Sequence, residues 1–187
     1  FENFQRISES ESLKSSYIAC SNDVADLELL LGAKFVARPI SEMKSIILLE
    51  MQNAIFMNML GSYKHAFSSL RSALEYFYSS ILFSTEEVKY RHWRGGEDDL
   101  SWAAVMEPER GVFSPRFFTA FAPELGHKAN EFSELARKLY RECSEYVHSN
   151  PKKVTNSTLT YEYDEALSLS FLEKISVAKT LFVFQFV

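Results

Sequence analysis

Residues Lys128–Asn150 repeat apolar and polar positions with the period of an α-helix. On a helical wheel of about 100° per residue with Phe132 as the reference, the apolar positions lie within about 60° of it. Arg141 and His148 fall on the opposite side, about two turns apart, and Pro151 ends the pattern. This indicates one long amphipathic helix whose polar face carries an arginine and a histidine. The apolar face consists of Leu135, Ala136, Leu139, Cys143, Tyr146 and Val147.

Two earlier segments show the same period and are separated by a Gly-Ser step. Ser41 is a preferred N-cap for a helix that runs to Leu60, Gly61 is a helix stop, and Ser62 caps the next helix. A connection this short is typical of two helices packed antiparallel. The pattern therefore predicts a long antiparallel helical hairpin within a core bundle at 41–187.

The first 40 residues are interpreted as a helical extension of that bundle. Residues 2–20 predict a helix with polar residues on most of its faces. Asn22 or Asp23 is placed to cap a second helix that ends at Gly32. The KFVARPI segment that follows is predicted to connect in extended form.

Periodicity weakens between the hairpin and the long helix. RHWRGGEDD is predicted to be a loop, Asp98 or Asp99 to cap a short helix through Met106, and Phe117 to lie in another short helix. After the long helix, residues 154–163 weakly alternate and are rich in Thr and Tyr. They predict an extended segment or a lone edge strand.

The predicted fold class is all-α, in one domain over residues 1–187. Asp164 is placed to cap a last, apolar helix. Glycine and proline number only 6 and 5, which is few for the frequent turns of an all-β chain.

Because the chain begins at Phe1 instead of methionine and stops inside the apolar run LFVFQFV, we expect it to be a trimmed chain or a piece of a longer protein.

Charge and cysteine usage narrow the function classes. The net charge of −5 argues against broad, nonspecific nucleic-acid binding, although residues 128–153 contain six basic and only four acidic residues. Cys20 and Cys143 follow neither a disulfide nor a metal-binding spacing, as expected in a reducing cytoplasm. Neither a signal peptide nor a membrane-length apolar run is present. The sequence predicts a cytoplasmic protein without membrane association.

Arg141 and His148 form the pattern R-x6-H in RECSEYVH, which resembles the R-x4–6-H motif of the HEPN superfamily. The resemblance covers this motif and the helical plan, including the hairpin at 41–83. It implies a small helical bundle and, as in many members, a metal-independent ribonuclease of a toxin–antitoxin, CRISPR or anti-phage system. It also implies a homodimer whose two motifs face one cleft. Glu142 departs from the family pattern, in which Asn or Asp often follows the arginine.

The two residue types suit RNA cleavage by 2′-hydroxyl attack. Histidine titrates near neutral pH and can take the 2′-hydroxyl proton or protonate the leaving 5′-oxygen, while arginine holds the phosphate. We expect RNA as the substrate, with neither metal nor cofactor. The predicted catalytic residues are Arg141 and His148, the supporting residues Ser144, Glu145 and Glu75, and the RNA-binding residues Arg137, Lys152 and Lys153.

Other interpretations account for the same residues. Arg141 and Glu145 are four residues apart, the spacing of an ordinary surface ion pair, and Arg71 and Glu75 form a second such pair. In this interpretation, the only role of His148 is to cap the C-terminus of its helix. The alternative function is a noncatalytic scaffold, or an RNA- or nucleotide-binding subunit, of a larger defence or toxin–antitoxin complex with a protein partner such as an antitoxin.

Overall fold

The computed structural model describes residues 2–33, 37–148 and 163–186, and these consist of helices joined by turns and short connections. The all-α prediction is therefore confirmed. The predicted extended segment at 154–163 lies outside the described residues except for Tyr163, which is in neither a helix nor a strand. The helices are α1 (Glu2–Glu9), α2 (Glu11–Leu31), α3 (Arg38–Met59), α4 (Tyr63–Thr85), α5 (Glu87–Gly95), α6 (Trp102–Val105), α7 (Pro115–Phe121), the 3-10 helix η1 (Pro123–Lys128), α8 (Ala129–Val147) and α10 (Glu165–Phe186).

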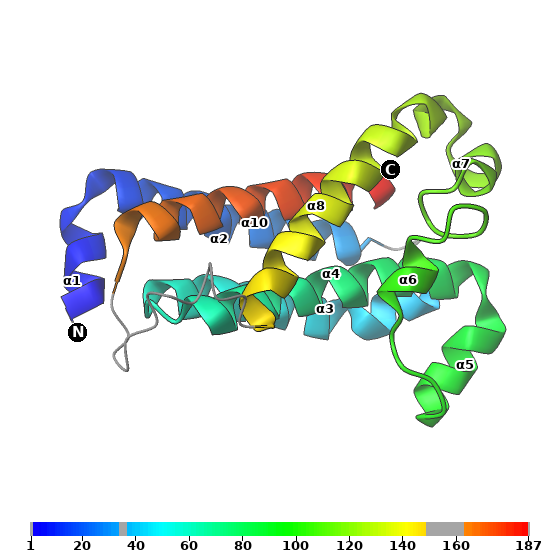
Figure 1. Cartoon of the computed structure of the whole chain (residues 1–187), viewed down its shortest axis with the longest axis horizontal. Coiled ribbons are helices and arrows are strands. Elements are labelled where there is room, and N and C mark those ends of the chain that lie inside the picture. The colour runs from blue at the N-terminus through cyan, green and yellow to red at the C-terminus, as the bar shows by residue number, and fades with distance from the viewer. Residues whose placement is uncertain (1, 34–36, 149–162, 187) are drawn as a thin grey trace.

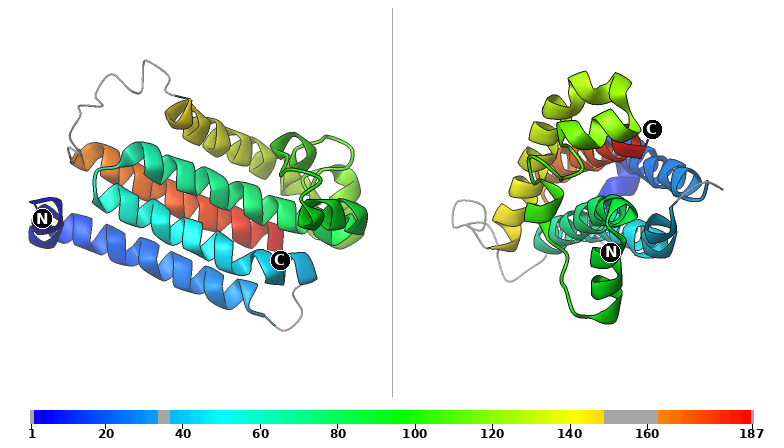
Figure 2. Two further views of the ribbon diagram at one scale, coloured as in Figure 1. Left: turned by 90° about the horizontal axis from the view of Figure 1, so that it is seen from below. Right: turned by 90° about the vertical axis from the view of Figure 1, so that its right-hand side faces the viewer.

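Helices α2, α3, α4 and α10 run side by side along the molecule (Figures 1 and 2). The predicted hairpin is present: α3 and α4 form the most extensive helix pair, and Gly61 joins them with a φ of 73°. Glycine reaches this left-handed conformation without a steric penalty. Helix α8 crosses α4 obliquely, while α5, α6 and α7 gather at one end of the bundle and α1 lies at the other (Figure 1).

Phenylalanine rings fill the core between α4 and α10. Phe77 stacks on Phe182 with ring centroids 4.0 Å apart, and Phe67 meets Phe171 edge to face at 4.8 Å. All four rings are fully buried. Burial of one such side chain contributes about 1.5–3 kcal/mol, so these contacts hold the hairpin against the last helix.

A buried hydrogen-bond network connects α2, α3 and α10. The Asn58 amide of α3 donates to the Tyr17 hydroxyl of α2 and to Ser168 Oγ of α10, both at 2.9 Å. The Tyr17 and Ser168 hydroxyls are 2.8 Å apart, and Tyr163 donates to Ser168 Oγ at 2.9 Å. An unpaired buried polar group costs about 1–3 kcal/mol, so the network favours one relative position of the three helices.

The break between the first two helices lies at Ser10, not near Asn22 as predicted. The Ser10 hydroxyl accepts a hydrogen bond from the Leu13 amide, and α2 then continues unbroken through Asn22. Its buried positions recur every three or four residues, so packing overrides the local cap signal. Helix α2 lies against α3 and α10, and the region interpreted as an extension thus contributes to the core. The buried residues are Leu13, Tyr17, Cys20, Val24, Leu27 and Leu31.

Helix α3 also begins earlier than predicted, at Arg38 instead of just after Ser41. Pro39 lies in the first turn, where its missing N–H costs no helical hydrogen bond. The prediction for the other end of the chain is confirmed: Asp164 caps α10, and its Oδ1 accepts from the Leu167 amide at 3.0 Å.

The region between hairpin and long helix is more helical than predicted. The first half of RHWRGGEDD belongs to α5, which ends at Gly95 and is followed by the C-cap residue Gly96 with a φ of 73°. Helix α6 is capped by Ser101, whose Oγ accepts from the Ala104 amide at 3.2 Å, and not by Asp98 or Asp99. The short helix predicted around Phe117 is confirmed as α7.

Candidate functional site

Aromatic packing fixes the end of α8 onto α4. The Tyr146 ring stacks on Phe67 with centroids 3.8 Å apart and planes 7° apart, and Cys143 is buried one turn earlier. Because Tyr146 lies only two residues before His148, this stack brings the histidine to α4. Arg71 lies there, one helical turn after Phe67.

Arg71 and Glu75 form the ion pair that their spacing predicts, and it is partly buried. Nη2 and Nε of Arg71 donate to Glu75 Oε1 at 3.2 and 3.3 Å, and the side chains are 24% and 25% exposed. Burial disfavours the charged guanidinium, but the Glu75 carboxylate outweighs it and raises the pKa of Arg71. Arg71 is therefore a positioned, permanent cation.

Tyr140 of α8 completes this arrangement from the other helix. Its hydroxyl donates to Glu75 Oε1 at 2.6 Å and accepts from Arg71 Nε at 3.1 Å. Its ring stacks on Trp102 with centroids 4.0 Å apart, and the Arg71 guanidinium lies 4.9 Å from the ring centroid. Burial and the bond to Glu75 raise the pKa of Tyr140 to about 12, so the phenol stays protonated as a donor.

His148 is the C-cap of α8, as one interpretation predicted, and its side chain also reaches Arg71. Its Nε2 lies 3.5 Å from Arg71 Nη1. An arginine can only donate, so this contact uses a neutral imidazole with the lone pair on Nε2. At 3.5 Å this hydrogen bond is long and weak, so another acceptor can replace His148 Nε2. We call the four side chains Arg71, Glu75, Tyr140 and His148 the Arg71 cluster.

Arg141 does not belong to this cluster. Its side chain is exposed, and it makes no hydrogen bond or ion pair within the described part of the chain. Glu145 is half-buried and likewise forms no ion pair with a described residue, so the predicted Arg141–Glu145 pair is absent there. Ser144 Oγ donates to the Tyr140 carbonyl at 2.9 Å, within its own helix. Of the predicted supporting residues, Glu75 is the one connected to His148, through Arg71.

Of the three predicted RNA-binding residues, only Arg137 lies within the described residues. Arg137 Nη2 donates to the Met106 carbonyl at 2.7 Å, which ties α8 to the end of α6. Lys152 and Lys153 lie outside the described residues. Arg137 thus has a structural role that the basic composition of the segment does not reveal.

Glu142, the departure from the HEPN pattern, connects two helices. Its Oε2 pairs with Lys174 Nζ of α10 at 2.9 Å, and the two side chains are only 29% and 23% exposed. The glutamate holds α8 against α10 and points away from the exposed face that carries Arg141. The departure is therefore accounted for by packing.

The described residues present no group of three or more His, Cys, Asp or Glu side chains arranged to hold a metal ion. No helix within those ranges combines the length and apolar character needed to cross a bilayer. The groups available for chemistry at this site are the His148 imidazole, the Arg71 guanidinium held by Glu75 and Tyr140, and the exposed Arg141 guanidinium.

The sequence pattern predicts the Arg71–Glu75 pair on the flank of its helix, but it does not indicate that Arg71 lies next to His148. It gives no functional signal for Tyr140 or Trp102. Tyr140 sits at the edge of the apolar face of α8, where an aromatic residue with a hydroxyl suits a partly polar contact. The missing information was which helix α8 crosses.

Comparison of the chain with protein-family models, curated proteins and solved structures finds no match.

Proposed function

We propose that this chain is a metal-independent, HEPN-like endoribonuclease of a cytoplasmic toxin or anti-phage defence system, acting as a homodimer. The observation that supports it best is the contact between His148 Nε2 and Arg71 Nη1 at the exposed end of α8. It pairs a group that can transfer a proton near neutral pH with a cation already fixed by two other side chains.

The proposed reaction uses the 2′-hydroxyl of RNA as the nucleophile. A phosphodiester replaces His148 as the acceptor of the Arg71 Nη1–H, and the released Nε2 lone pair takes the 2′-hydroxyl proton. The 2′-oxygen bonds to phosphorus, the bond to the 5′-oxygen breaks, and a 2′,3′-cyclic phosphate forms. His148 of the second subunit acts as the acid in its protonated, imidazolium form and gives its proton to the leaving 5′-oxygen, so one histidine gains the proton that the other loses.

Arg71 and Arg141 have different roles in this proposal. Glu75 and Tyr140 hold Arg71 in place, so its guanidinium is oriented before the substrate arrives. Arg141 is exposed and unpaired within the described residues, which leaves its whole fork available to bind a phosphate. Arg71 thus stabilises charge at the reacting group, and Arg141 binds the RNA backbone.

Incubation of the protein with total RNA in EDTA tests the proposal. We expect fragments that end in 2′,3′-cyclic phosphate, and His148→Ala and Arg141→Ala should each abolish their formation. His127→Ala is the matched control, because His127 is an exposed histidine outside the cluster. Lack of cleavage by the unmodified protein, or cleavage that survives His148→Ala, would rule out this function.

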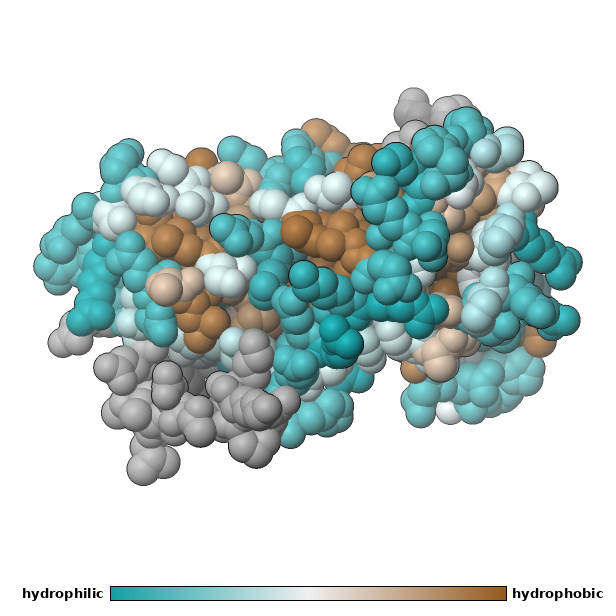
Figure 3. Space-filling model, turned by 45° about the horizontal axis from the view of Figure 1, so that its top comes forward, coloured by the Kyte–Doolittle hydropathy of each residue, from teal (hydrophilic) through white to brown (hydrophobic). Residues whose placement is uncertain are grey.

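The alternative is a noncatalytic scaffold of a larger defence or toxin–antitoxin complex, and exposed apolar side chains favour it. Leu49 and Phe56, two turns apart on α3, are 51% and 48% exposed, and Leu29 of α2 is 77% exposed. Apolar residues also reach the surface in separate patches in Figure 3. If the scaffold function holds, RNA stays intact, and a Leu49→Ser/Phe56→Ser double variant loses association that sedimentation detects in the unmodified protein.

A further inference from the structure

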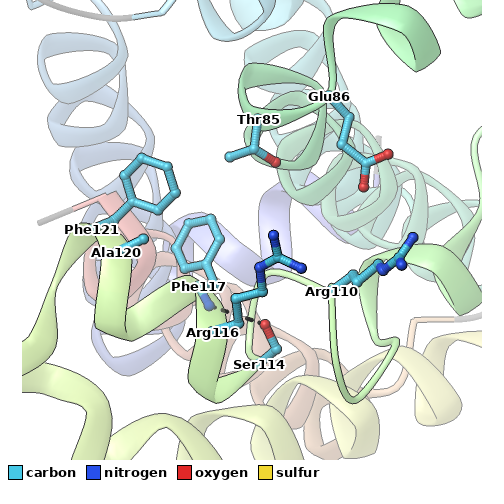
Figure 4. A pocket seen from close by; sticks show the side chains of 8 residues that line it. All are labelled: Thr85, Glu86, Arg110, Ser114, Arg116, Phe117, Ala120 and Phe121. Atoms are coloured by element: carbon cyan, nitrogen blue, oxygen red, sulfur yellow. Dashed lines mark hydrogen bonds between the residues drawn. The ribbon is translucent and has the colours of Figure 1, made fainter.

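A pocket of about 520 Å³ lies between the end of α4 and helix α7 (Figure 4). Helix α7 is at the end of the bundle away from α1 (Figure 1). Two phenylalanines and two arginines are among its lining residues. In Figure 4 the Arg116 guanidinium lies between the Phe117 ring and Arg110, and all three face the space below Thr85 and Glu86. The volume is in the range of small-molecule sites.

The aromatic side of the pocket consists of Phe117 and Phe121, one turn apart on α7. Their ring centroids are 4.9 Å apart with planes tilted by 42°. Phe121 is 64% exposed, an unusual state for phenylalanine in a folded chain. The exposed Phe121 ring, with the partly buried Phe117 ring beside it, provides a stacking surface for a nucleobase.

The cationic side consists of Arg110 and Arg116. Both are exposed, and neither guanidinium makes an ion pair or hydrogen bond with a described residue. The acid that lines the pocket, Glu86, is already paired with Lys89 at 2.7 Å. The lining therefore favours an anion, although the whole chain carries a charge of −5.

Ser114 adds a directional group at the base of the pocket. It is only 2% exposed, and its Oγ accepts from the Phe117 amide at 3.1 Å as the N-cap of α7. The hydroxyl proton forms no hydrogen bond to a described residue, so it can be donated to a ligand oxygen.

The wall that carries Arg110 is firmly anchored. The Gly111 amide donates to the Glu107 carbonyl at 2.8 Å and the Val112 amide to the Val105 carbonyl at 3.0 Å. Gln185 of α10 donates to the Val112 carbonyl at 2.8 Å. The loop is thus fixed to both α6 and α10 by backbone and side-chain hydrogen bonds.

We propose that this pocket binds a nucleoside phosphate, with the base stacked on Phe117 and Phe121 and the phosphate held by Arg110 and Arg116. A mononucleotide combines a flat ring with a doubly charged group, which matches two rings beside two unpaired guanidiniums. The pocket size suits one nucleotide. This site is separate from the Arg71 cluster and does not depend on the proposed nuclease activity.

Calorimetric titration with AMP, UMP, adenosine and inorganic phosphate tests the proposal. We expect the nucleotides to bind with a Kd on the order of 10–100 µM, the affinity of a ligand of this size at ordinary ligand efficiency. Adenosine and phosphate should each bind at least tenfold more weakly. Equal affinity for AMP and phosphate would indicate an adventitious anion site and overturn the proposal, as would no binding of either nucleotide at millimolar concentration.

Variants identify the site. Arg110→Ala and Arg116→Ala should each weaken AMP binding at least tenfold, and Phe121→Ala should weaken it while Phe121→Trp retains it. Arg6→Ala is the matched control, because Arg6 is exposed and unpaired within the described chain and lies on α1 at the opposite end. AMP binding that both arginine variants retain would overturn the proposal. The substituted side chains are all exposed, so thermal unfolding should confirm that the variants remain folded.

Discussion

The imidazole of His148 and the guanidinium of Arg71 lie 3.5 Å apart, although 77 residues separate them in the chain. The two residues are brought together where α8 crosses α4, and the Tyr146–Phe67 stack holds the two helices in contact there. The cation next to the histidine is therefore supplied by the hairpin, while the arginine of the R-x6-H pattern lies two turns away on the exposed face. This relationship changes which substitutions are informative.

Arg71→Ala should reduce RNA cleavage by about a hundredfold, the usual effect of removing one preorganised donor to a developing charge. Arg71→Lys should also reduce it, since an ammonium cannot reproduce the fork that binds Glu75 and a phosphate together. Initial rates with a labelled oligonucleotide measure both effects. Arg91→Ala is the matched control because Arg91 forms the same i,i+4 pair with Glu87 at 2.8 Å on α5. Full activity of Arg71→Ala would remove this residue from the mechanism.

Tyr140→Phe should lower the free energy of unfolding by about 1 kcal/mol at pH 8, since it removes a hydrogen bond to a partly exposed carboxylate. The pKa of Tyr140 is raised from 10 to about 12 in the folded protein. The unfolded chain therefore loses this proton first, and the stability that Tyr140 contributes is complete below pH 10 and declines as the pH rises toward 12.

Denaturant unfolding of the two proteins at intervals from pH 8 to pH 12 checks this dependence. The stability difference between the unmodified protein and Tyr140→Phe should shrink above pH 10. Because the Glu75 carboxylate contributes to the raised pKa of Tyr140 in the folded protein, the decline should end at a lower pH when Glu75→Gln is present in both proteins. A difference that stays constant over the whole range would contradict the assignment.

Loss of the hydroxyl should destabilise the protein at one buried tyrosine and not at another. Tyr78 is fully buried and its hydroxyl has no hydrogen-bond partner among the described residues, so Tyr78→Phe should leave stability unchanged or raise it by about 1 kcal/mol. The Tyr17 hydroxyl accepts from Asn58 and lies 2.8 Å from Ser168 Oγ. Tyr17→Phe should lower stability by about 1–3 kcal/mol, because it leaves buried partners unpaired.

Thermal and urea unfolding of the two variants provide the comparison. Both substitutions remove one oxygen from a buried ring, so each serves as the control for the other. Destabilisation of similar size in both would show that the Tyr78 hydroxyl has a partner in solution.

Gly111→Ala should destabilise the protein by about 2–3 kcal/mol through overpacking against backbone. A Cβ at this position would lie 2.3 Å from the Val105 carbonyl oxygen and 2.5 Å from the Glu107 carbonyl oxygen. Gly126→Ala is the control, because its Cβ would have one ordinary contact, at 3.7 Å from Phe118 Cβ. Urea unfolding measures the two differences, and equal stability of both variants would contradict the close approach at Gly111.

Local patterns were sufficient to predict the hairpin, the apolar face of α8 and the Asp164 cap, because each depends on residues a few positions apart. Ser10 and Ser101 were missed as caps because several polar residues nearby can serve equally well, and packing decides among them. The Arg71–His148 contact could not be predicted, since it depends on the crossing of two helices distant in sequence. The role of Glu142 could not be predicted either, because its ion-pair partner Lys174 lies on another helix, α10.

The Asn58–Tyr17–Ser168 network also limits how the bundle can assemble. One turn of an α-helix advances about 5.4 Å along the axis, so sliding α10 by one turn against α3 would carry Ser168 Oγ beyond reach of the Asn58 amide. Apolar side chains on α2, α3 and α10 would tolerate many such offsets, whereas three short polar groups accept only one. The alignment of these helices is thus set by a few atoms at one level, and hydrophobic packing then strengthens the alignment that those atoms have selected.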